Sequence, residues 1–195
     1  MTQTILRIDS SIKGDQSVSR QLSDRIVARL TEAAPDSRVV TRDLADLDLP
    51  MINGDWLGAV FTPEGERSAE QQRTAELSDR LIAEVKAADV LVIGLPVYNF
   101  ALPAQLKAWV DHLCRKGETF YYTDSGPVGL VENTRAIIAM TSDGTQMGSE
   151  IDFATPYLRH ILGFIGITDV QVVAADRMAF DRDAAIGAAR EAVEG

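Results

Sequence analysis

The chain of 195 residues is 46% hydrophobic and 25% charged, as is typical of a soluble globular protein, and we expect residues 1–195 to form a single domain. Its formal net charge of −10 argues against nucleic-acid binding and disfavours docking on an anionic membrane surface. The single cysteine, Cys114, excludes an intramolecular disulfide. One cysteine and two histidines are a poor set of metal ligands, so no metal is expected.

Short apolar segments rich in β-branched residues alternate along the chain with longer segments of helical periodicity. Strands are predicted at residues 4–9, 38–42, 89–94, 135–141 and 169–174, and helices at residues 19–33, 66–87, 102–116, 155–165 and 181–193. The helix ends have suitable residues: Ser17 or Ser19 can cap the first helix, Pro103 and Pro156 suit a first turn, and Gly117 suits a helix end. Residues 43–63 lack clear periodicity and are predicted to form a long loop, which in a compact domain is usually functional or disordered; its aromatic residues argue against simple disorder.

Five strand–helix alternations with nearly continuous apolar strands predict an α/β fold with a parallel sheet covered by helices on both faces. The usual five-stranded arrangement is doubly wound, with strand order 2-1-3-4-5. A Rossmann dinucleotide fold is the nearest alternative, but the first strand–helix turn lacks G-x-G-x-x-G. The sequence likewise contains no P-loop motif.

The loop from the first strand into the first helix is a candidate phosphate site. Ser10, Ser17 and Ser19 supply hydroxyl groups, and the start of the following helix, next to Val18, supplies free N–H groups and a positive dipole end. Together these groups can bind a phosphate monoester without a strongly cationic cradle. Serines are also common as ordinary loop residues and helix caps, so this loop does not establish a site by itself.

The loop after the third strand, Pro96-Val97-Tyr98-Asn99-Phe100, is a candidate site for a planar ring. Pro96 ends the strand and Pro103 can open the next helix, so the residues between them form a confined turn. The two aromatic side chains offer apolar surface, while Asn99 and backbone N–H groups can address polar edge atoms. Capping of the core is the alternative role for these aromatics.

The loop after the fourth strand begins Ser142-Asp143-Gly144-Thr145, and its glycines, Gly144 and Gly148, permit positive φ and a close approach to a ligand. The three candidate loops follow strands one, three and four, which lie side by side in the doubly wound order. We therefore expect all three loops to converge at the C-terminal edge of the sheet.

Several motifs recur in the order and spacing of one known family. They are Ser10-Ser11 with residues 17–19, and residues 96–100, 105–107, 117–123, 126–130, 156–158 and 163–166. On these residues the chain resembles the FMN-dependent NADH-azoreductase family of flavodoxin-like NADH:quinone oxidoreductases, over nearly its whole length.

The resemblance implies a flavodoxin-like fold that binds FMN, with Ser10 and Ser17–Ser19 at the phosphate, Val97–Phe100 around the isoalloxazine and Ser142–Thr145 beside it. It also implies a homodimer with active sites at the interface, where Phe120 or Tyr122 stacks against substrates. NADH would donate hydride to flavin N5, and quinones or azo compounds would then accept two electrons in a ping-pong cycle. No obligatory catalytic acid or base is nominated, because the cofactor supplies the chemistry.

The third loop departs from that family. Members of the family have Ser-Arg-Gly-Gly there, whereas this chain has Ser142-Asp143-Gly144-Thr145, with Asp143 in place of the arginine. A carboxylate in place of a cation alters the local field and puts the substrate range in doubt, including the use of anionic dyes. NADH is favoured over NADPH because the sequence shows no evident arginine cluster for a 2′-phosphate.

Two other functions stay open. A flavodoxin-type electron carrier would suit the acidic charge, because such carriers dock on basic partners, and a regulatory protein that has lost its flavin is a further alternative. His112, His160 and Cys114 are expected to be structural, and Tyr121 and Tyr122 can simply pack a β-hairpin. Since the sequence shows neither a signal peptide pattern nor a long apolar segment, a cytoplasmic enzyme is expected.

Overall fold

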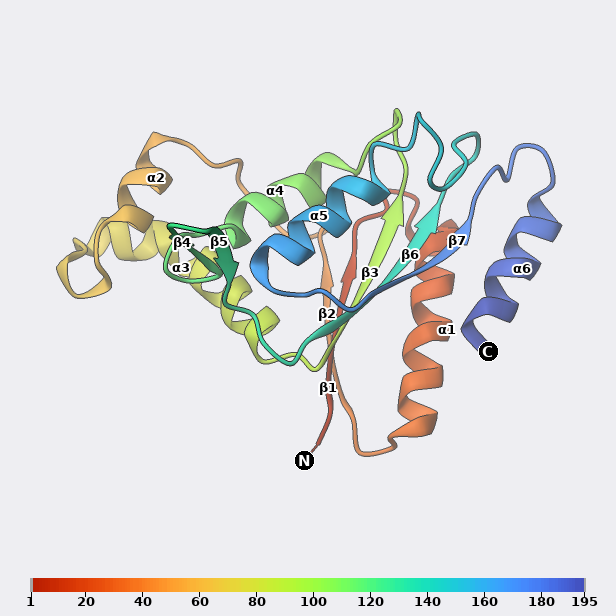
Figure 1. The fold of residues 1–195 in the computed structure, drawn as a ribbon, viewed down its shortest axis with the longest axis horizontal. Coiled ribbons are helices and arrows are strands. Elements are labelled where there is room, and N and C mark those ends of the chain that lie inside the picture. Colours follow the sequence, from red (N-terminus) through yellow and green to blue (C-terminus); the bar gives the residue numbers. More distant parts are fainter. Residues whose placement is uncertain (1, 195) are drawn as a thin grey trace.

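The computed structural model, which describes residues 2–194, has a five-stranded parallel sheet at its centre (Figure 1). Its strand order is β2-β1-β3-β6-β7. Strands β4 and β5 form a separate hairpin, so β6 and β7 are the fourth and fifth strands of the sheet, and the predicted order 2-1-3-4-5 is confirmed. The strands of the sheet are β1 (Thr4–Asp9), β2 (Arg38–Asp43), β3 (Val90–Pro96), β6 (Arg135–Thr141) and β7 (Val170–Ala175).

The central strands are apolar on both faces because helices cover both sides of the sheet. Successive side chains of a strand point to opposite faces, so Leu91 and Ile93 pack into one hydrophobic cluster while Val90 and Val92 pack into the other. Every residue of β3 is buried. The continuous apolar run that the sequence shows there is therefore the expected pattern for a strand between two helical layers.

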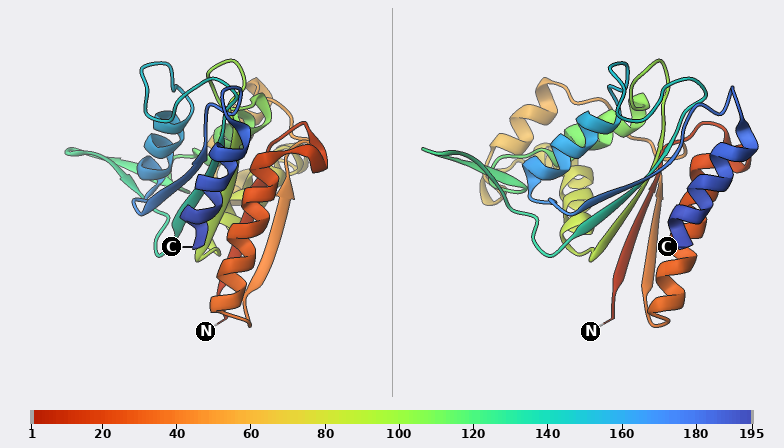
Figure 2. Two further views of the ribbon diagram at one scale, coloured as in Figure 1. Left: turned by 90° about the vertical axis from the view of Figure 1, so that its right-hand side faces the viewer. Right: turned by 45° about the vertical axis from the view of Figure 1, so that its right-hand side comes forward.

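Helices form a layer on each face of the sheet (Figure 2). One layer contains α1 (Val18–Ala33) and α6 (Arg182–Glu194), and the other contains α3 (Ala69–Lys86), α4 (Ala104–Leu113) and α5 (Thr155–Ile165). Ser17 caps α1, as predicted, and Pro156 lies in the first turn of α5. Within the described residues, no helix combines the length and apolar composition needed to cross a bilayer.

The structure corrects two details of the predicted elements. The segment expected to be a long loop contains a further helix, α2 (Gly54–Phe61), whose first turn is capped by the Asn53 side chain. Helix α4 ends at Leu113 rather than near residue 116. Gly117 is therefore not the helix end: with φ +86 it turns the chain toward β4 (Phe120–Thr123), and its N–H donates to the carbonyl oxygen of Phe120 at 2.7 Å.

Strands β4 and β5 (Gly126–Gly129) form an antiparallel hairpin outside the main sheet. The hairpin packs against α5: the Phe120 and Phe164 rings lie 4.4 Å apart, and Gly129 lies directly against the backbone at Gly166. In Figure 1 the hairpin lies near α2 and α3, away from the C-terminal ends of the central strands. Tyr121 and Tyr122 both lie in this hairpin, and both side chains are exposed.

Candidate functional site

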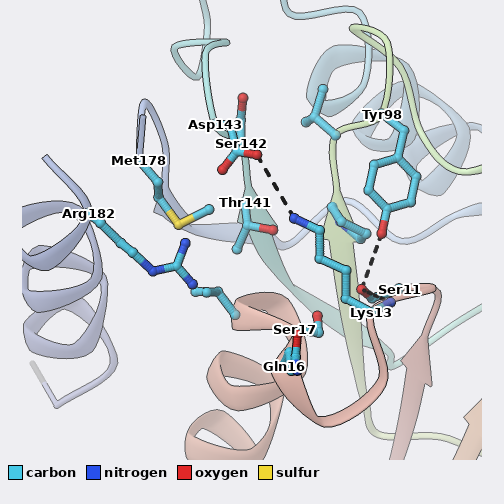
Figure 3. A pocket seen from close by; sticks show the side chains of 13 residues that line it. Ser11, Lys13, Gln16, Ser17, Tyr98, Thr141, Ser142, Asp143, Met178 and Arg182 are labelled. Atoms are coloured by element: carbon cyan, nitrogen blue, oxygen red, sulfur yellow. Dashed lines mark hydrogen bonds and ion pairs between the residues drawn. The ribbon is translucent and has the colours of Figure 1, made fainter. Parts of the chain in front are cut away.

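A cavity of about 290 Å³ lies at the C-terminal ends of β1, β3 and β6 (Figure 3). All three loops singled out in the sequence contribute to its wall, so their predicted convergence is confirmed. The residues lining it are Ser11, Lys13, Gln16, Ser17, Val18, Pro96, Val97, Tyr98, Thr141, Ser142, Asp143, Met178 and Arg182. It is the natural site for a ligand in an open α/β sheet, because the strand order reverses there.

The first loop presents an anion-binding helix N-terminus. The Ser17 hydroxyl accepts a hydrogen bond from the Arg20 N–H at 3.3 Å and lies 3.0 Å from the Ser19 hydroxyl. Among residues 2–194, the backbone N–H groups of Val18 and Ser19 have no hydrogen-bond acceptor. Two free N–H groups, serine hydroxyls and the positive end of a 16-residue helix fit a phosphate group.

Ser10 and Ser11 have different surroundings. The Ser10 hydroxyl is fully buried and donates to the carbonyl oxygen of Gly94 at 2.8 Å, which ties the first loop to β3. Ser11 lines the cavity, and its hydroxyl lies 3.2 Å from that of Tyr98. Ser10, the predicted phosphate ligand, is thus placed behind the loop, and Ser11, which the sequence analysis left out of the site, faces the cavity.

The second loop is a tight two-residue turn in an uncommon backbone conformation. Tyr98 and Ala101 exchange backbone hydrogen bonds of 2.9 and 3.1 Å, and both intervening residues have positive φ, 50° for Asn99 and 69° for Phe100. This is the pattern of a type I′ turn, in which the left-handed conformation costs a bulky residue such as Phe100 roughly 1–2 kcal/mol. Such strain is often found at binding sites. The turn leaves Phe100 about half exposed.

The third loop is anchored to the segment that precedes α6. The Ser142 hydroxyl accepts from the Thr145 N–H at 2.7 Å, and the carbonyl oxygens of Ser142 and Asp143 accept from Met178 and Ala179 at 3.0 and 2.9 Å. Ser142 and Thr145 are buried, whereas Asp143 is exposed at the rim. The two loop glycines differ, since Gly148 has a positive φ of 74° and Gly144 does not.

A partly buried network of charged side chains, with Asp9 at its centre, lies beneath the first loop. Burial raises the pKa of the Asp9 carboxyl, and the guanidinium groups of Arg7 and Arg20 offset part of that rise. Arg20 also donates through Nη2 to the carbonyl oxygen of Ser11 at 2.8 Å and pairs with Asp43. The side chain of Arg20 therefore connects the first loop to the end of β2 and holds the start of α1 in place.

Two predicted aromatic residues do not reach this cavity within one protomer. Phe120 is buried against Phe164, whereas Tyr122 is 61% exposed. Both line a separate apolar groove of about 390 Å³, whose opposite wall is formed by α2 through Trp56 and Leu57. Of the two candidates, only Tyr122 offers an accessible ring to a neighbouring molecule.

Six cavity residues were not among the predicted site residues: Ser11, Lys13, Gln16, Thr141, Met178 and Arg182. Lys13 and Gln16 belong to the first loop, so its position after a strand was the available signal. Met178 and Arg182 come from beyond the last strand, and no motif marks them. Lys13 Nζ lies 3.9 Å from Asp143 Oδ2 across the cavity (Figure 3).

The residues expected to be structural lie outside the cavity. His112 is buried, with Nε2 2.9 Å from the carbonyl oxygen of Pro50, and His160 is exposed on α5. Burial raises the pKa of the Cys114 thiol to about 11, and the neighbouring Asp111 adds to that rise. Since the thiolate is the nucleophile, the protonated thiol at neutral pH suits a packing role.

Comparison with known proteins shows one consistent set of relatives. A sequence profile of the flavodoxin-like fold family matches residues 3–195. An FMN-dependent NADH:quinone oxidoreductase of Cereibacter sphaeroides is 60% identical over 190 residues, covering 97% of this chain and 96% of the relative. A protein of Jannaschia sp., named FMN-dependent NADH:quinone oxidoreductase 1, is 55% identical with the same coverage.

Solved structures give the same picture. An azoreductase from Bacillus anthracis strain Sterne has a TM-score of 0.89 at 28% identity, covering 99% of this chain and 97% of the other. An FMN-dependent NADH-azoreductase from the Bacillus anthracis Ames Ancestor strain, solved in complex with FMN, has a TM-score of 0.88 at 27% identity. That match covers 100% of this chain and 96% of the other.

Proposed function

The chain belongs to the family of flavodoxin-like FMN-dependent NADH:quinone oxidoreductases, and we propose that it holds FMN in the cavity at the sheet edge and reduces quinones and aromatic azo compounds with NADH. One observation of this structure carries the proposal: the start of α1 at Ser17 and Val18 and the second loop at Pro96–Tyr98 line one cavity, next to the strained turn at Asn99 and Phe100. When bound, FMN takes up a hydride from NADH and passes two electrons to the acceptor.

We assign the two ends of the cofactor to opposite sides of the cavity. The phosphate would be held by Ser17, Val18 and Ser19, with Ser10 bracing this loop against β3. The ring end would lie against the second loop, Pro96-Val97-Tyr98-Asn99-Phe100, and beside the third, Ser142-Asp143-Gly144-Thr145. Support comes from the backbone N–H groups of Asn99 and Phe100, which have no acceptor in the described part of the chain and which a type I′ turn leaves available to polar edge atoms.

The protein's own contribution to the reaction is binding and orientation. We nominate no catalytic acid or base. Asp143 places a carboxylate at the rim of the cavity and should lower the affinity for anionic acceptors such as sulfonated dyes. Lys13 opposes that charge from 3.9 Å, although the exposure of both side chains makes the pair weak.

The decisive test is an acceptor screen on the purified protein. We expect a yellow protein that releases FMN on heating and oxidises NADH with a soluble quinone, faster than it oxidises NADPH at equal concentration. A colourless protein that does not bind added FMN would contradict the proposal. A protein that binds FMN but needs an added reductase before the quinone is reduced would instead be an electron carrier.

We further propose a homodimer in which Tyr122 of one protomer covers the cavity of its partner. Supporting this, the ring is 61% exposed, and it lies on a hairpin remote from the cavity of its own protomer. Two surfaces of the protomer expose apolar side chains. Phe100 and Phe153 lie near the second loop of the cavity, and Leu57 and Phe61 lie on α2. A two-fold interface would bring unlike patches together in both copies.

Mixing two defective variants tests this arrangement. If Tyr122 acts on its partner's cavity, Tyr122→Ala mixed with a variant unable to bind FMN should regain about a quarter of wild-type activity, since half the dimers then carry one intact site. The protein should also sediment at twice the monomer mass. A monomer, or a mixture that regains nothing after subunit exchange is verified, would contradict the proposal.

Two broader assignments complete the proposal. Residues 1–195 would act as one domain, which is supported by hydrophobic clusters that pack on opposite faces of the same sheet. The enzyme would work in the cytoplasm, which is supported by the NADH dependence in the names of its relatives, because NADH is available there.

A further inference from the structure

The first residue of α6, Arg182, carries a charge that its helix does not favour. Asp181 caps this helix: its Oδ1 accepts from the Ala184 N–H at 3.0 Å, and its carbonyl oxygen accepts from Ala185 at 3.1 Å. A helix N-terminus has a positive dipole end, so a cation in the first turn is unfavourable and an anion such as Asp183 is favourable. The position of Arg182 is therefore not explained by the stability of α6. A residue that breaks a local rule in this way points to a ligand.

The fold holds the start of α6 at the cavity wall. Three hydrogen bonds join the preceding segment to the third loop: Met178 to Ser142 at 3.0 Å, Ala179 to Asp143 at 2.9 Å, and the Met147 N–H to Asp176 Oδ2 at 2.6 Å. The Arg182 side chain extends from this anchored point into the cavity, toward the first loop (Figure 3). These contacts hold the backbone at the start of α6, whereas the Arg182 side chain is exposed and has no ion pair within residues 2–194.

The cavity wall contains two cations, and their surroundings differ. Lys13 lies within 4 Å of Asp143, whereas Arg182 has no carboxylate partner in residues 2–194. Across the cavity from Arg182 lie Gln16 and Ser17, at the positive end of α1 (Figure 3). A guanidinium without a carboxylate partner in residues 2–194 and a helix N-terminus line one cavity of a chain whose net charge is −10, and together they suit a bound dianion.

We propose that Arg182 binds the FMN phosphate from the side opposite α1. The inference rests on the proposed function, because it requires FMN in this cavity. Serine hydroxyls and backbone N–H groups would hold one side of the phosphate, and the guanidinium would neutralise the other. The C-terminal helix thereby becomes part of the cofactor site.

Two flavins and two matched arginine variants test the proposal. Arg182→Gln removes the cavity charge, and Arg190→Gln removes an exposed charge of the same helix that does not line the cavity. Quenching of flavin fluorescence gives Kd for apoprotein with FMN and with riboflavin, which lacks the phosphate. We expect Arg182→Gln to weaken FMN binding about tenfold and to reduce its salt dependence, with riboflavin affinity unchanged. Arg190→Gln should change neither, and Arg182→Lys should recover most of the loss.

Stability of the apoprotein separates this role from a structural one. Because the cation is unfavourable where it lies, Arg182→Gln should leave the apoprotein Tm unchanged or slightly higher, while the FMN-induced rise in Tm becomes smaller. Equal losses of FMN and riboflavin affinity, a lower apoprotein Tm, or an unchanged Kd for FMN would each overturn the inference. If the wild-type protein binds neither flavin, the proposed function itself fails, which is a different result.

Discussion

Replacing Gly129 with alanine is expected to destabilise the protein by roughly 3 kcal/mol or more, through overpacking that cannot relax. A Cβ atom at Gly129 would lie 2.1 Å from the backbone nitrogen of Gly166 and 2.3 Å from the carbonyl carbon of Ile165. Both are main-chain atoms at the end of α5, so no side-chain movement can make room. The β4–β5 hairpin would have to separate from the helix, and Tyr122 would move with it.

Gly163, which lies within α5, provides the control for that prediction. Around Gly163 a Cβ atom would meet nothing within 4 Å, so Gly163→Ala should stabilise α5 by up to about 1 kcal/mol through its better helix propensity. Urea denaturation of both variants measures the two free energies of unfolding. A Gly129→Ala protein within about 0.5 kcal/mol of wild type would show that the hairpin does not depend on this close contact.

The second large effect is expected at the first residue of α1. Proline is accepted at this helix position, and Ser17, with φ −75° and ψ 122°, has the extended backbone that a residue before proline requires. Val18→Pro should therefore keep the helix while removing one of the two N–H groups proposed to bind the phosphate. A lost hydrogen bond to a charged group is worth about 1.5–3 kcal/mol, so FMN affinity should fall roughly tenfold to a hundredfold.

Val18→Ala is the matched control, because it removes the buried side chain but keeps the N–H group. Fluorescence titrations with FMN and riboflavin, together with far-UV circular dichroism, distinguish the outcomes. The proline variant should lose affinity for FMN more than for riboflavin, with its helix signal retained. If both variants bind FMN equally well, the N–H of Val18 is not a ligand of the phosphate.

The strands were the most predictable elements, because burial between two helical layers requires continuous apolar segments. Strands β1 and β6 match their predicted bounds, and the others differ by one or two residues. Helix α2 was missed for an identifiable reason. Gly54 and Gly58 are unfavourable in helices, and this helix depends on a cap from Asn53 and on burial of Trp56. The Asn53 cap is local, whereas the burial of Trp56 depends on tertiary contacts.

Prediction of the site had a similar limit. The loops could be located because each follows a strand, and the strand order brings their ends together. Which serine faces the cavity could not be decided, since Ser10 and Ser11 are adjacent and of the same type. Ser10 donates to Gly94 on the neighbouring strand, and that contact is made only when β1 and β3 pair.

By itself the sequence determined the sheet, the two helical layers and the three loops at one edge, because period-two and helical patterns are local and strand order follows from chirality and connection rules. The tertiary structure alone decided which side chains share the cavity. It placed Arg182 across the cavity from the start of α1, Asp143 within 4 Å of Lys13, and Tyr122 on a separate hairpin. These are contacts between segments distant in sequence, and no local pattern specifies them.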